Sequence, residues 1–393
     1  MIIKKAYKFR LKPSIEQEQK LVSYAGHTRF LWNKALKLNL LKLQNKQPVM
    51  YYGELDFWSK LWKKSDEYSF LKECPAHIIQ QKLKDLQKAF LDCFDKKQPN
   101  KKLPRIKKKG YGDSFRFPEP KHIRLEHNYL TLPKLGRMKF YQSCKIDGVI
   151  KNYTVSRRGN HWYIALQVEL EINNEHRLIT NTKSITKDIG IDVGIKHFVS
   201  TSNGEQIAPL NMYRRLSKQL GKAQRRLKNK VKFSNNWKKQ QTKIRKIHSK
   251  IADTRRDFLN KLSTNLCKNH AMIVVEDLRI KNMSKSAKGT LEQPGKNVNA
   301  KSGLNKSILD QGWYEFKRQL KYKMNWLGGI LLEVPAKYTS QRCSNCNHVA
   351  AANRQTQEYF ECVKCSYQSN ADVNAAKNIL AAGHAVLACG ASA

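Results

Sequence analysis

Three acidic residues that are far apart in the sequence stand in or beside apolar segments. Asp192 lies in an apolar strand pattern flanked by glycines, Glu276 ends a second apolar strand pattern, and Asp372 opens a helical one. Carboxylates gathered on one rigid sheet can hold two Mg²⁺ ions against a scissile phosphate. A charge inside an apolar strand costs several kcal/mol unless it is paired or metal-bound. The three residues together therefore predict a two-metal site.

Each of the three carboxylates also has a plainer explanation when it is taken alone. Asp192 could cap a turn at a strand end, and a carboxylate such as Glu276 at the end of a buried strand is common. Asp372 precedes a short run of Asn, Ala and Lys, and an aspartate in that place is typical of a helix N-cap. The combination is more specific than any single member.

Four of the nine cysteines form a doubled Cys-x2-Cys pattern. Each pair offers two thiolates to one ion at tetrahedral angles, and a gap of 15 residues between the pairs is typical of a Zn²⁺ ribbon. Four thiolates leave no open position for a substrate, so the zinc would be structural. A redox pair or disulfides are alternatives that a reducing compartment disfavours. The predicted ligands are Cys343, Cys346, Cys362 and Cys365.

The charge of the chain points to a polyanionic partner. Among 393 residues, 75 Lys and Arg oppose 31 Asp and Glu, which gives a formal net charge of +44. Such a charge repels itself unless a polyanion binds it, and nucleic acid is the expected one. An anionic membrane surface is the alternative, but no apolar stretch reaches the length of a membrane span. The first residues lack the apolar core of a secretory signal, so we expect a cytoplasmic protein with no membrane partner.

The N-terminal half predicts a strand, a helical bundle and then a sheet. The strand covers residues 1–10, and the third helix of the bundle begins after Pro75 and ends near Lys96. A basic connector follows, which is either a phosphate contact or a solvated loop. Short alternating strands over 114–171 predict a small β-barrel. Since the first strand precedes the bundle, we expect it to join this barrel and the bundle to be an insertion.

The C-terminal half predicts a mixed α/β domain that begins with three antiparallel strands, as an RNase H-like fold does. Residues 281–306 lack periodicity and predict a mobile loop beside the site or a plain linker. Ser307 with Asp310 predicts a capping box that opens the next helix. The expected elements are strands at 189–193, 197–200, 205–207, 271–276 and 330–334, and helices at 212–230, 235–270, 313–327 and 371–382.

The two long helices of this half are strongly basic. Like charges four residues apart destabilise an isolated helix, so a face with so many charges of one sign indicates phosphate binding rather than solubility alone. The first helix carries its arginines in two adjacent pairs, Arg214 and Arg215, then Arg225 and Arg226.

The segments around the three acids and the four cysteines resemble those of the TnpB family, the transposon-encoded RNA-guided nucleases ancestral to type V CRISPR effectors. Residues 8–13, 29–33 and 338–343 strengthen the resemblance, which covers nearly the whole chain. It implies a multidomain α+β protein with a recognition bundle inserted in an oligonucleotide-binding-like wedge barrel. The implied domains are the wedge at 1–12 and 97–180, the bundle at 13–96, a RuvC nuclease domain at 181–336 and 369–383, a zinc-ribbon target-nucleic-acid-binding insert at 337–368 and a flexible tail at 384–393.

The resemblance implies that Asp192, Glu276 and Asp372 are a RuvC triad that works with Mg²⁺ or Mn²⁺ beside a structural Zn²⁺. It implies an RNA-guided endonuclease that cleaves double-stranded DNA next to a short flanking motif, as a monomeric prokaryotic ribonucleoprotein with a transposon-derived guide RNA. Tyr52 and Gln80 are expected to face the DNA beside the target. The alternatives are a cleavage-deficient RNA-guided regulator and a strand-transfer transposase.

Two features depart from the family pattern. Asn347 and Ser366 stand where each cysteine knuckle usually has glycine, so the second knuckle is expected to be strained or differently turned. Ala371 stands where many relatives carry an arginine directly before the last aspartate, which removes one possible substrate contact.

Overall fold

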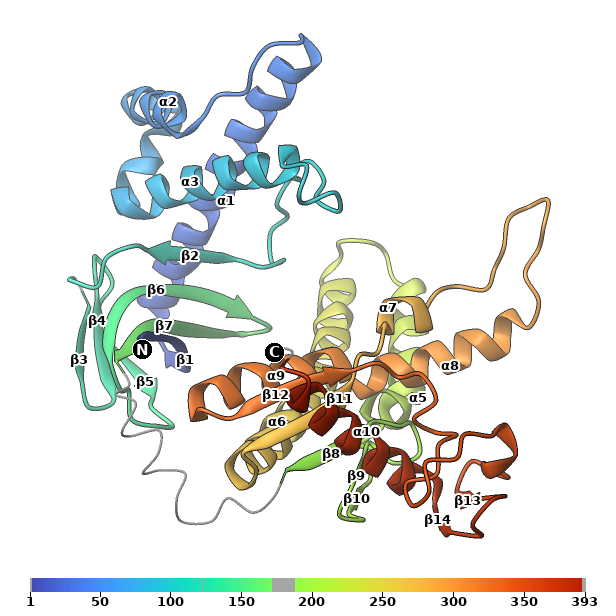
Figure 1. Cartoon of the computed structure of the whole chain (residues 1–393). Coiled ribbons are helices and arrows are strands. Elements are labelled where there is room, and N and C mark those ends of the chain that lie inside the picture. The colour runs from blue at the N-terminus through green and yellow to red at the C-terminus, as the bar shows by residue number, and fades with distance from the viewer. Residues whose placement is uncertain (1, 122, 172–187, 391–393) are drawn as a thin grey trace. The chain divides into compact units, whose positions relative to one another are not determined.

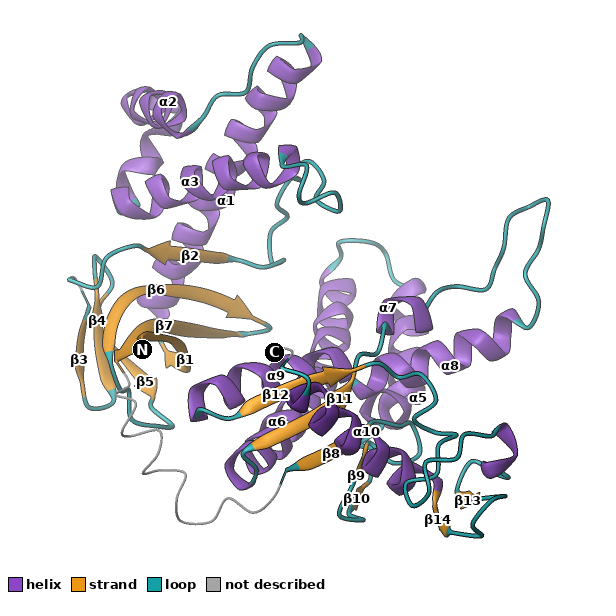
Figure 2. Cartoon of the chain, viewed as in Figure 1, coloured by secondary structure: helices purple, strands orange, loops and turns teal. Residues whose placement is uncertain are grey.

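A computed structural model describes residues 2–121, 123–171 and 188–390. The chain divides into two units, Met1–Ile172 and Asn173–Ala393 (Figure 1). Both units mix helices with strands (Figure 2). The expected boundary between wedge and nuclease at 180–181 lies outside the described residues, and the other domain limits stay predictions.

The first unit is built on one antiparallel sheet with the strand order β2-β6-β7-β1-β5-β4-β3. As expected, β1 joins the strands that follow the helices, pairing with β7 from Ile2 opposite Glu171 to Arg10 opposite Tyr163. Among the described residues β2 and β3 are the edges of the sheet and do not pair with each other, so the closed barrel that we expected is not confirmed. Its strands are β1 (Ile2–Lys12), β2 (Ser114–Phe117), β3 (Arg124–Glu126), β4 (Tyr129–Leu132), β5 (Gly136–Tyr141), β6 (Val149–Arg158) and β7 (His161–Glu171).

The helices of the first unit lie between β1 and β2 in sequence, which confirms that the bundle is an insertion in the sheet. Ser14 and Gln17 form a capping box at the start of α1, and the Gln17 amide also donates to the carbonyl groups of Leu135 and Arg137. This contact fastens the bundle to the β4–β5 turn. The helices are α1 (Ile15–Gln44), α2 (Tyr52–Lys64), the 3₁₀ helix η1 (Asp66–Glu73) and α3 (Ala76–Phe94).

The second unit contains a five-stranded sheet with the order β10-β9-β8-β11-β12. The first three strands in sequence form the antiparallel meander that we predicted, and β8, β11 and β12 are parallel. Parallel strands need a crossover, which the two long helices provide between β8 and β11. The strands are β8 (Ile189–Asp192), β9 (Val199–Thr201), β10 (Gln206–Ile207), β11 (Met272–Glu276) and β12 (Ile330–Val334).

Helices cover both faces of this sheet (Figure 2). Ile273 and Val275 pack with residues of α6 and α9, whereas Met272 and Val274 pack with Ile379 of α10. The alternation along β11 explains why all four positions are apolar, since both faces of a covered parallel strand are buried. The helices are α5 (Met212–Lys228), α6 (Asn235–Asn269), α7 (Ile280–Met283), α8 (Val298–Gln311), α9 (Trp313–Leu327) and α10 (Ala371–Ala388).

Three expectations about this unit were wrong. Residues 298–306 belong to helix α8 rather than to a loop, because Ile308 is buried in the core and holds the helix there. Ser307 and Asp310 lie inside α8 instead of capping α9, and the Asp310 carboxylate accepts from the backbone N–H groups of Tyr213 and Arg214 at the start of α5. The supposed tail from residue 384 continues α10 to Ala388, as its alanine-rich sequence favours.

Candidate active site and cysteine ribbon

The acidic site begins at the carboxyl edge of the parallel strands. Asp192 is the last residue of β8 and Glu276 is the last residue of β11. In the register of these strands Ile191 lies opposite Val275, so the two carboxyl-bearing residues are neighbours at the same edge of the sheet. The sheet thus brings together two of the three carboxylates that we expected to gather on it, and their role at a metal site stays a prediction.

Asp372 reaches this edge from the first turn of α10. The N-cap of that helix is Asn370, whose side-chain oxygen accepts from the backbone N–H groups of Asp372 and Val373. The plainer explanation of Asp372 as the N-cap is therefore wrong, because Asn370 and not the Asp372 carboxylate caps the helix. Gly190 lets α10 approach, because a Cβ at that position would lie 2.1 Å from the Ala376 carbonyl oxygen.

The three carboxylates interact electrostatically. Burial, helped by the negative charges of Glu276 and Asp372, raises the pKa of Asp192 to about 7. Burial also raises the pKa of Glu276, although the hydroxyl of Thr339 opposes this change. A bound divalent cation would relieve both the burial of the Asp192 charge and its repulsion by the two neighbouring acids. All three residues offer the oxygen ligands that Mg²⁺ and Mn²⁺ prefer.

Two side chains that the sequence reasoning missed contact the acids. The Thr339 hydroxyl donates to Glu276 Oε1 at 2.5 Å, and the Arg354 guanidinium lies 3.5 Å from Asp372 Oδ1. Thr339 lies in one of the segments that resemble the TnpB family, so its motif was a signal, whereas nothing in the sequence distinguishes Arg354 from other basic residues. Position 371, where many relatives carry an arginine, holds the fully buried Ala371 in this chain. Arg354 nevertheless places a guanidinium beside Asp372.

Both missed residues lie between β12 and α10, in a segment (335–370) that we call the cysteine ribbon. It contains the 3₁₀ helix η2 (Ala351–Asn353) and the paired strands β13 (Tyr359–Glu361) and β14 (Gln368–Asn370). The Lys196 side chain, four residues after Asp192, forms an ion pair with Glu358 of this segment. The ribbon therefore lies beside the acidic edge of the sheet.

The four predicted cysteine ligands come together in the ribbon. Their Sγ atoms all lie within 4.8 Å of one another, with 3.7 Å between Cys343 and Cys365 and 3.5 Å between Cys346 and Cys362. A tetrahedral Zn²⁺ site with bonds of about 2.3 Å requires sulfur atoms about 3.8 Å apart. The cluster thus fits one zinc ion. A backbone N–H group of Tyr367 lowers the pKa of Cys365 to about 6, which favours the thiolate that a metal binds.

The two knuckles have the same turn. Asn347 N–H donates to the Cys343 carbonyl and Ser366 N–H donates to the Cys362 carbonyl, each at 2.9 Å. Asn347 has φ 62° and Ser366 has φ 54°, both in the left-handed region. The second knuckle is therefore turned like the first, and its serine carries the backbone strain that we expected.

The predicted nucleic-acid contacts are distributed over both units. In the second unit Arg214, Arg215, Arg225 and Arg226 are exposed on α5. A separation of eleven residues is about three helical turns, so the two arginine pairs lie on the same face of α5, with about 16 Å between them along the helix axis. In the first unit Tyr52 begins α2, with the Lys84 ammonium 4.8 Å from its ring centre, and Gln80 is half-buried on α3. No observation tests these four arginines or these two residues as contacts.

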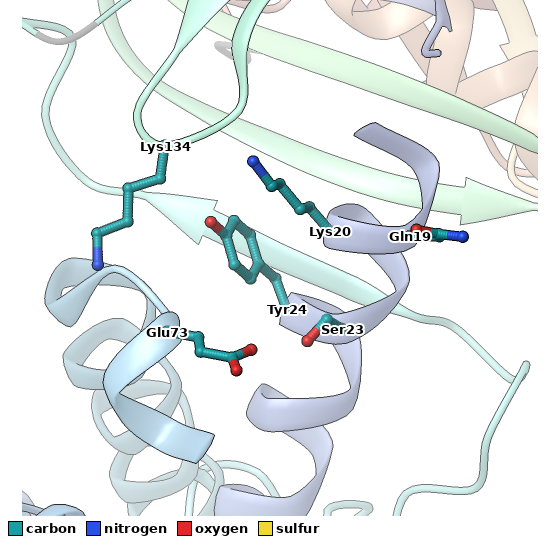
Figure 3. Close-up of a pocket in the computed structure, with 6 residues that line it drawn as sticks. All are labelled: Gln19, Lys20, Ser23, Tyr24, Glu73 and Lys134. Carbon is teal, nitrogen blue, oxygen red and sulfur yellow. The ribbon is translucent and has the colours of Figure 1, made fainter. Parts of the chain in front are cut away.

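Two cavities differ in chemistry from the acidic site. In the first unit Lys20, Ser23 and Tyr24 of α1 face Glu73 and Lys134 around a cavity of about 400 Å³ (Figure 3). It contains a single carboxylate, Glu73, and so lacks the cluster of acids that a two-metal site requires. In the second unit Lys196, Arg214 and Lys306 line a cavity of about 770 Å³. These three cations suit a phosphate backbone that passes the loop after Asp192.

Family models match three parts of the chain. Residues 165–287 match the IS605 OrfB model, described as "Probable transposase". Residues 313–379 match the "Cas12f1-like, TNB domain" model, which includes the cysteine ribbon. Residues 1–46 match the "Helix-turn-helix domain" model of the same OrfB group.

Curated relatives match over almost the whole chain. "Putative RNA-guided DNA endonuclease InsQ" of Escherichia coli (strain K12) is 47% identical over 98% of this chain and 94% of the relative. "Putative RNA-guided DNA endonuclease" of Streptomyces pristinaespiralis is 32% identical over 99% of this chain and 91% of the relative.

Among solved structures, the "Cas12f1-sgRNA-target DNA complex" is 15% identical, covers 96% of this chain and 99% of its own and has a TM-score of 0.35. In the part of this chain that the structure describes, no helix is both long and apolar enough to cross a membrane.

Proposed function

Because the chain belongs to the TnpB (IS605 OrfB) family, we propose that it is an RNA-guided DNA endonuclease of a transposon, cutting double-stranded DNA beside a short flanking motif. The observation that supports cleavage most directly is the meeting of Asp192, Glu276 and Asp372 at one edge of the sheet. A chain that served only as a regulator would have no need to keep a buried Asp192 with two further acids beside it.

Asp192, Glu276 and Asp372 would hold a pair of Mg²⁺ or Mn²⁺ ions, and by family resemblance Asp192 would be the ligand common to both. Such ions, when bound, lower the pKa of a water nucleophile and stabilise the leaving oxygen of a phosphodiester. Thr339 holds the Glu276 carboxylate in one orientation, and Asn370 fixes the first turn that carries Asp372. Arg354 is close enough to Asp372 to meet a phosphate bound at the acids.

The remaining assignments follow the family. The second unit is the RuvC nuclease domain of RNase H-like fold, and the cysteine ribbon is its zinc-bearing insert for target nucleic acid. The sheet of the first unit is the wedge, and its inserted helices are the recognition domain. A net charge of +44 exceeds what a short DNA duplex can neutralise, so most of the basic surface binds a structured guide RNA. The working form is a monomeric ribonucleoprotein.

The decisive experiment changes only the guide segment of the RNA and maps the cut sites on linear duplex DNA in the presence of Mg²⁺. Cutting should move to each new guide-matched sequence and should require the RNA. Cut sites that stay in place, or equal cutting by RNA-free protein, would show that the guided mechanism is wrong. Action at transposon ends would identify a strand-transfer transposase, and guided binding without cutting would identify a regulator.

Asp192→Ala provides the matched control for this assay. It should abolish cleavage and leave binding of RNA and DNA almost intact, because Asp192 serves metal rather than phosphate contacts. Equal loss of binding and cutting would mean that Asp192 has a structural role instead.

A further inference from the structure

Two buried asparagines lie one turn apart on α10, the helix that carries Asp372. The side chain of Asn374 has an exposed fraction of 0% and that of Asn378 has 5%. Buried amides are costly unless their polar atoms are bonded. A helix that only packed on the sheet would be expected to carry apolar residues at these two positions, so the asparagines require another reason.

The amide groups of both asparagines bind the start of the cysteine ribbon. Asn374 Nδ2 and Asn378 Nδ2 donate to the Arg342 carbonyl oxygen at 2.8 and 2.7 Å. Asn374 Oδ1 accepts from the backbone N–H of Ser344 at 3.0 Å. Arg342 and Ser344 are the two neighbours of Cys343, so α10 holds a zinc-binding cysteine from both sides. Cys343 itself is fully buried and packs in one cluster with Ala371.

Asn378 is also connected to the acidic site, through Thr339. Asn378 Nδ2 also donates to the Thr339 carbonyl oxygen at 2.9 Å. The hydroxyl of Thr339 donates to Glu276 Oε1, on a different element of the unit. Asn378 of α10 therefore holds two carbonyl groups at the start of the ribbon, those of Thr339 and Arg342, and Thr339 in turn bonds the carboxylate at the end of β11.

We propose that Asn374 and Asn378 are positioning residues that hold residues 339–344, the start of the cysteine ribbon, against α10. Thr339, held in this way, orients Glu276 for metal binding. The proposal rests on the function proposed above. Groups that orient a metal-binding carboxylate influence the affinity of the metal although they do not touch it, typically by 10- to 100-fold.

The test measures Mn²⁺ binding to the zinc-loaded full chain by the electron paramagnetic resonance signal of free Mn²⁺. Thr339→Val removes the hydroxyl and should weaken Mn²⁺ binding by about tenfold or more. Thr339→Ser keeps the hydroxyl and should retain wild-type affinity. Thr264→Val is the matched control, because its hydroxyl bonds to Asn260 and Lys323 rather than to an acid. Zinc content, measured by elemental analysis, should stay unchanged in all three variants.

Asn378→Ala tests the connection between the ribbon and the acid. It should weaken Mn²⁺ binding to a similar extent as Thr339→Val, and the double variant should show little further loss, because both changes break one series of contacts. Fully additive losses, or equal affinities of Thr339→Val and Thr339→Ser, would overturn the proposal. If Asn378→Ala does not fold, the Thr339 pair decides alone.

The same titration separates this proposal from the proposed function. Wild-type protein should bind Mn²⁺ at a site that Asp192→Ala removes. Absence of that site would contradict the metal-dependent nuclease itself. A site that is present, and that the Thr339 variants leave unaffected, would contradict only the positioning role.

Discussion

Replacing Asp192 with Asn should stabilise the protein in the absence of Mg²⁺ while it abolishes cleavage. Burial and the neighbouring acids raise the pKa of Asp192 from 3.8 to about 7, so the ionised carboxylate is disfavoured in the folded chain. The gap between these two values corresponds to about 4 kcal/mol. Asparagine has the shape of the protonated acid and no charge, and it should remove this cost.

The sign of the effect depends on pH. A carboxyl group with a raised pKa binds its proton more tightly in the folded state than in the unfolded state, so wild-type stability falls as pH rises from about 4 through about 7. Asp192→Asn should therefore raise the free energy of unfolding by up to about 4 kcal/mol at pH 8, but by only about 1.5 kcal/mol at pH 5. Excess Mg²⁺ should reduce the advantage at pH 8, because the wild type alone binds the ion.

Urea denaturation at both pH values measures this difference. The buffers should be free of Mg²⁺ but should contain no strong chelator, which would remove the structural zinc. Asp257→Asn, on the exposed face of α6, is a matched control with an expected change within about 0.5 kcal/mol. An equal gain at pH 5 and pH 8, or a loss of stability at pH 8, would refute the argument that burial and the neighbouring acids raise the pKa of Asp192 in the folded chain.

Three further variants test other parts of the structure. Gly190→Ala should lower the free energy of unfolding by about 1–3 kcal/mol and impair cleavage, because the added methyl meets the backbone of α10. The control is Gly303→Ala, whose methyl enters open space and should not lower the melting temperature. Ser366→Gly should stabilise the zinc-loaded protein by about 1 kcal/mol in thermal melts by relieving its left-handed backbone, and an unchanged melting temperature would argue against strain there. Gln80→Ala should alter the preferred flanking sequence in a randomised-library cleavage assay, since a glutamine that reads adenine contributes about 1–3 kcal/mol, and an unaltered preference would remove Gln80 from the interface.

Short-range patterns account for the parts of the fold that the sequence predicted well. The short apolar run before Glu276 gives β11, and the helical spacing after Pro75, which repeats over many residues, gives α3. The three acids were predicted from their combination and from the family resemblance, since each acid alone also fits a turn, a strand end or a helix cap. The doubled cysteine spacing was sufficient by itself, because both pairs have the separation that one zinc ion needs.

The contacts that the sequence did not predict join residues that are distant in sequence. The pattern at Ser307 and Asp310 matches a local cap, but Asp310 binds the start of α5, 96 and 97 residues away, and forms an ion pair with Arg255. Similarly, nothing local shows that Arg354 meets Asp372 or that Asn378 holds Thr339. A polar side chain has many possible partners, and only the folded chain selects among them.

The place of the cysteine ribbon in the sequence connects the proposed zinc site with the acids proposed to bind Mg²⁺. The ribbon leaves the sheet at the carboxyl end of β12 and returns at the first turn of α10, and both points lie at the edge that holds the acids. Its first residues therefore reach Glu276, and its later residues reach Asp372. Because the four cysteines and the three acids have no residue in common, a zinc ion on the cysteines would stabilise the ribbon while the acids bound and released the ions proposed for them. A ribbon that served DNA contact alone would not need its first residues to be hydrogen-bonded both to α10, which carries Asp372, and to Glu276 at the end of β11.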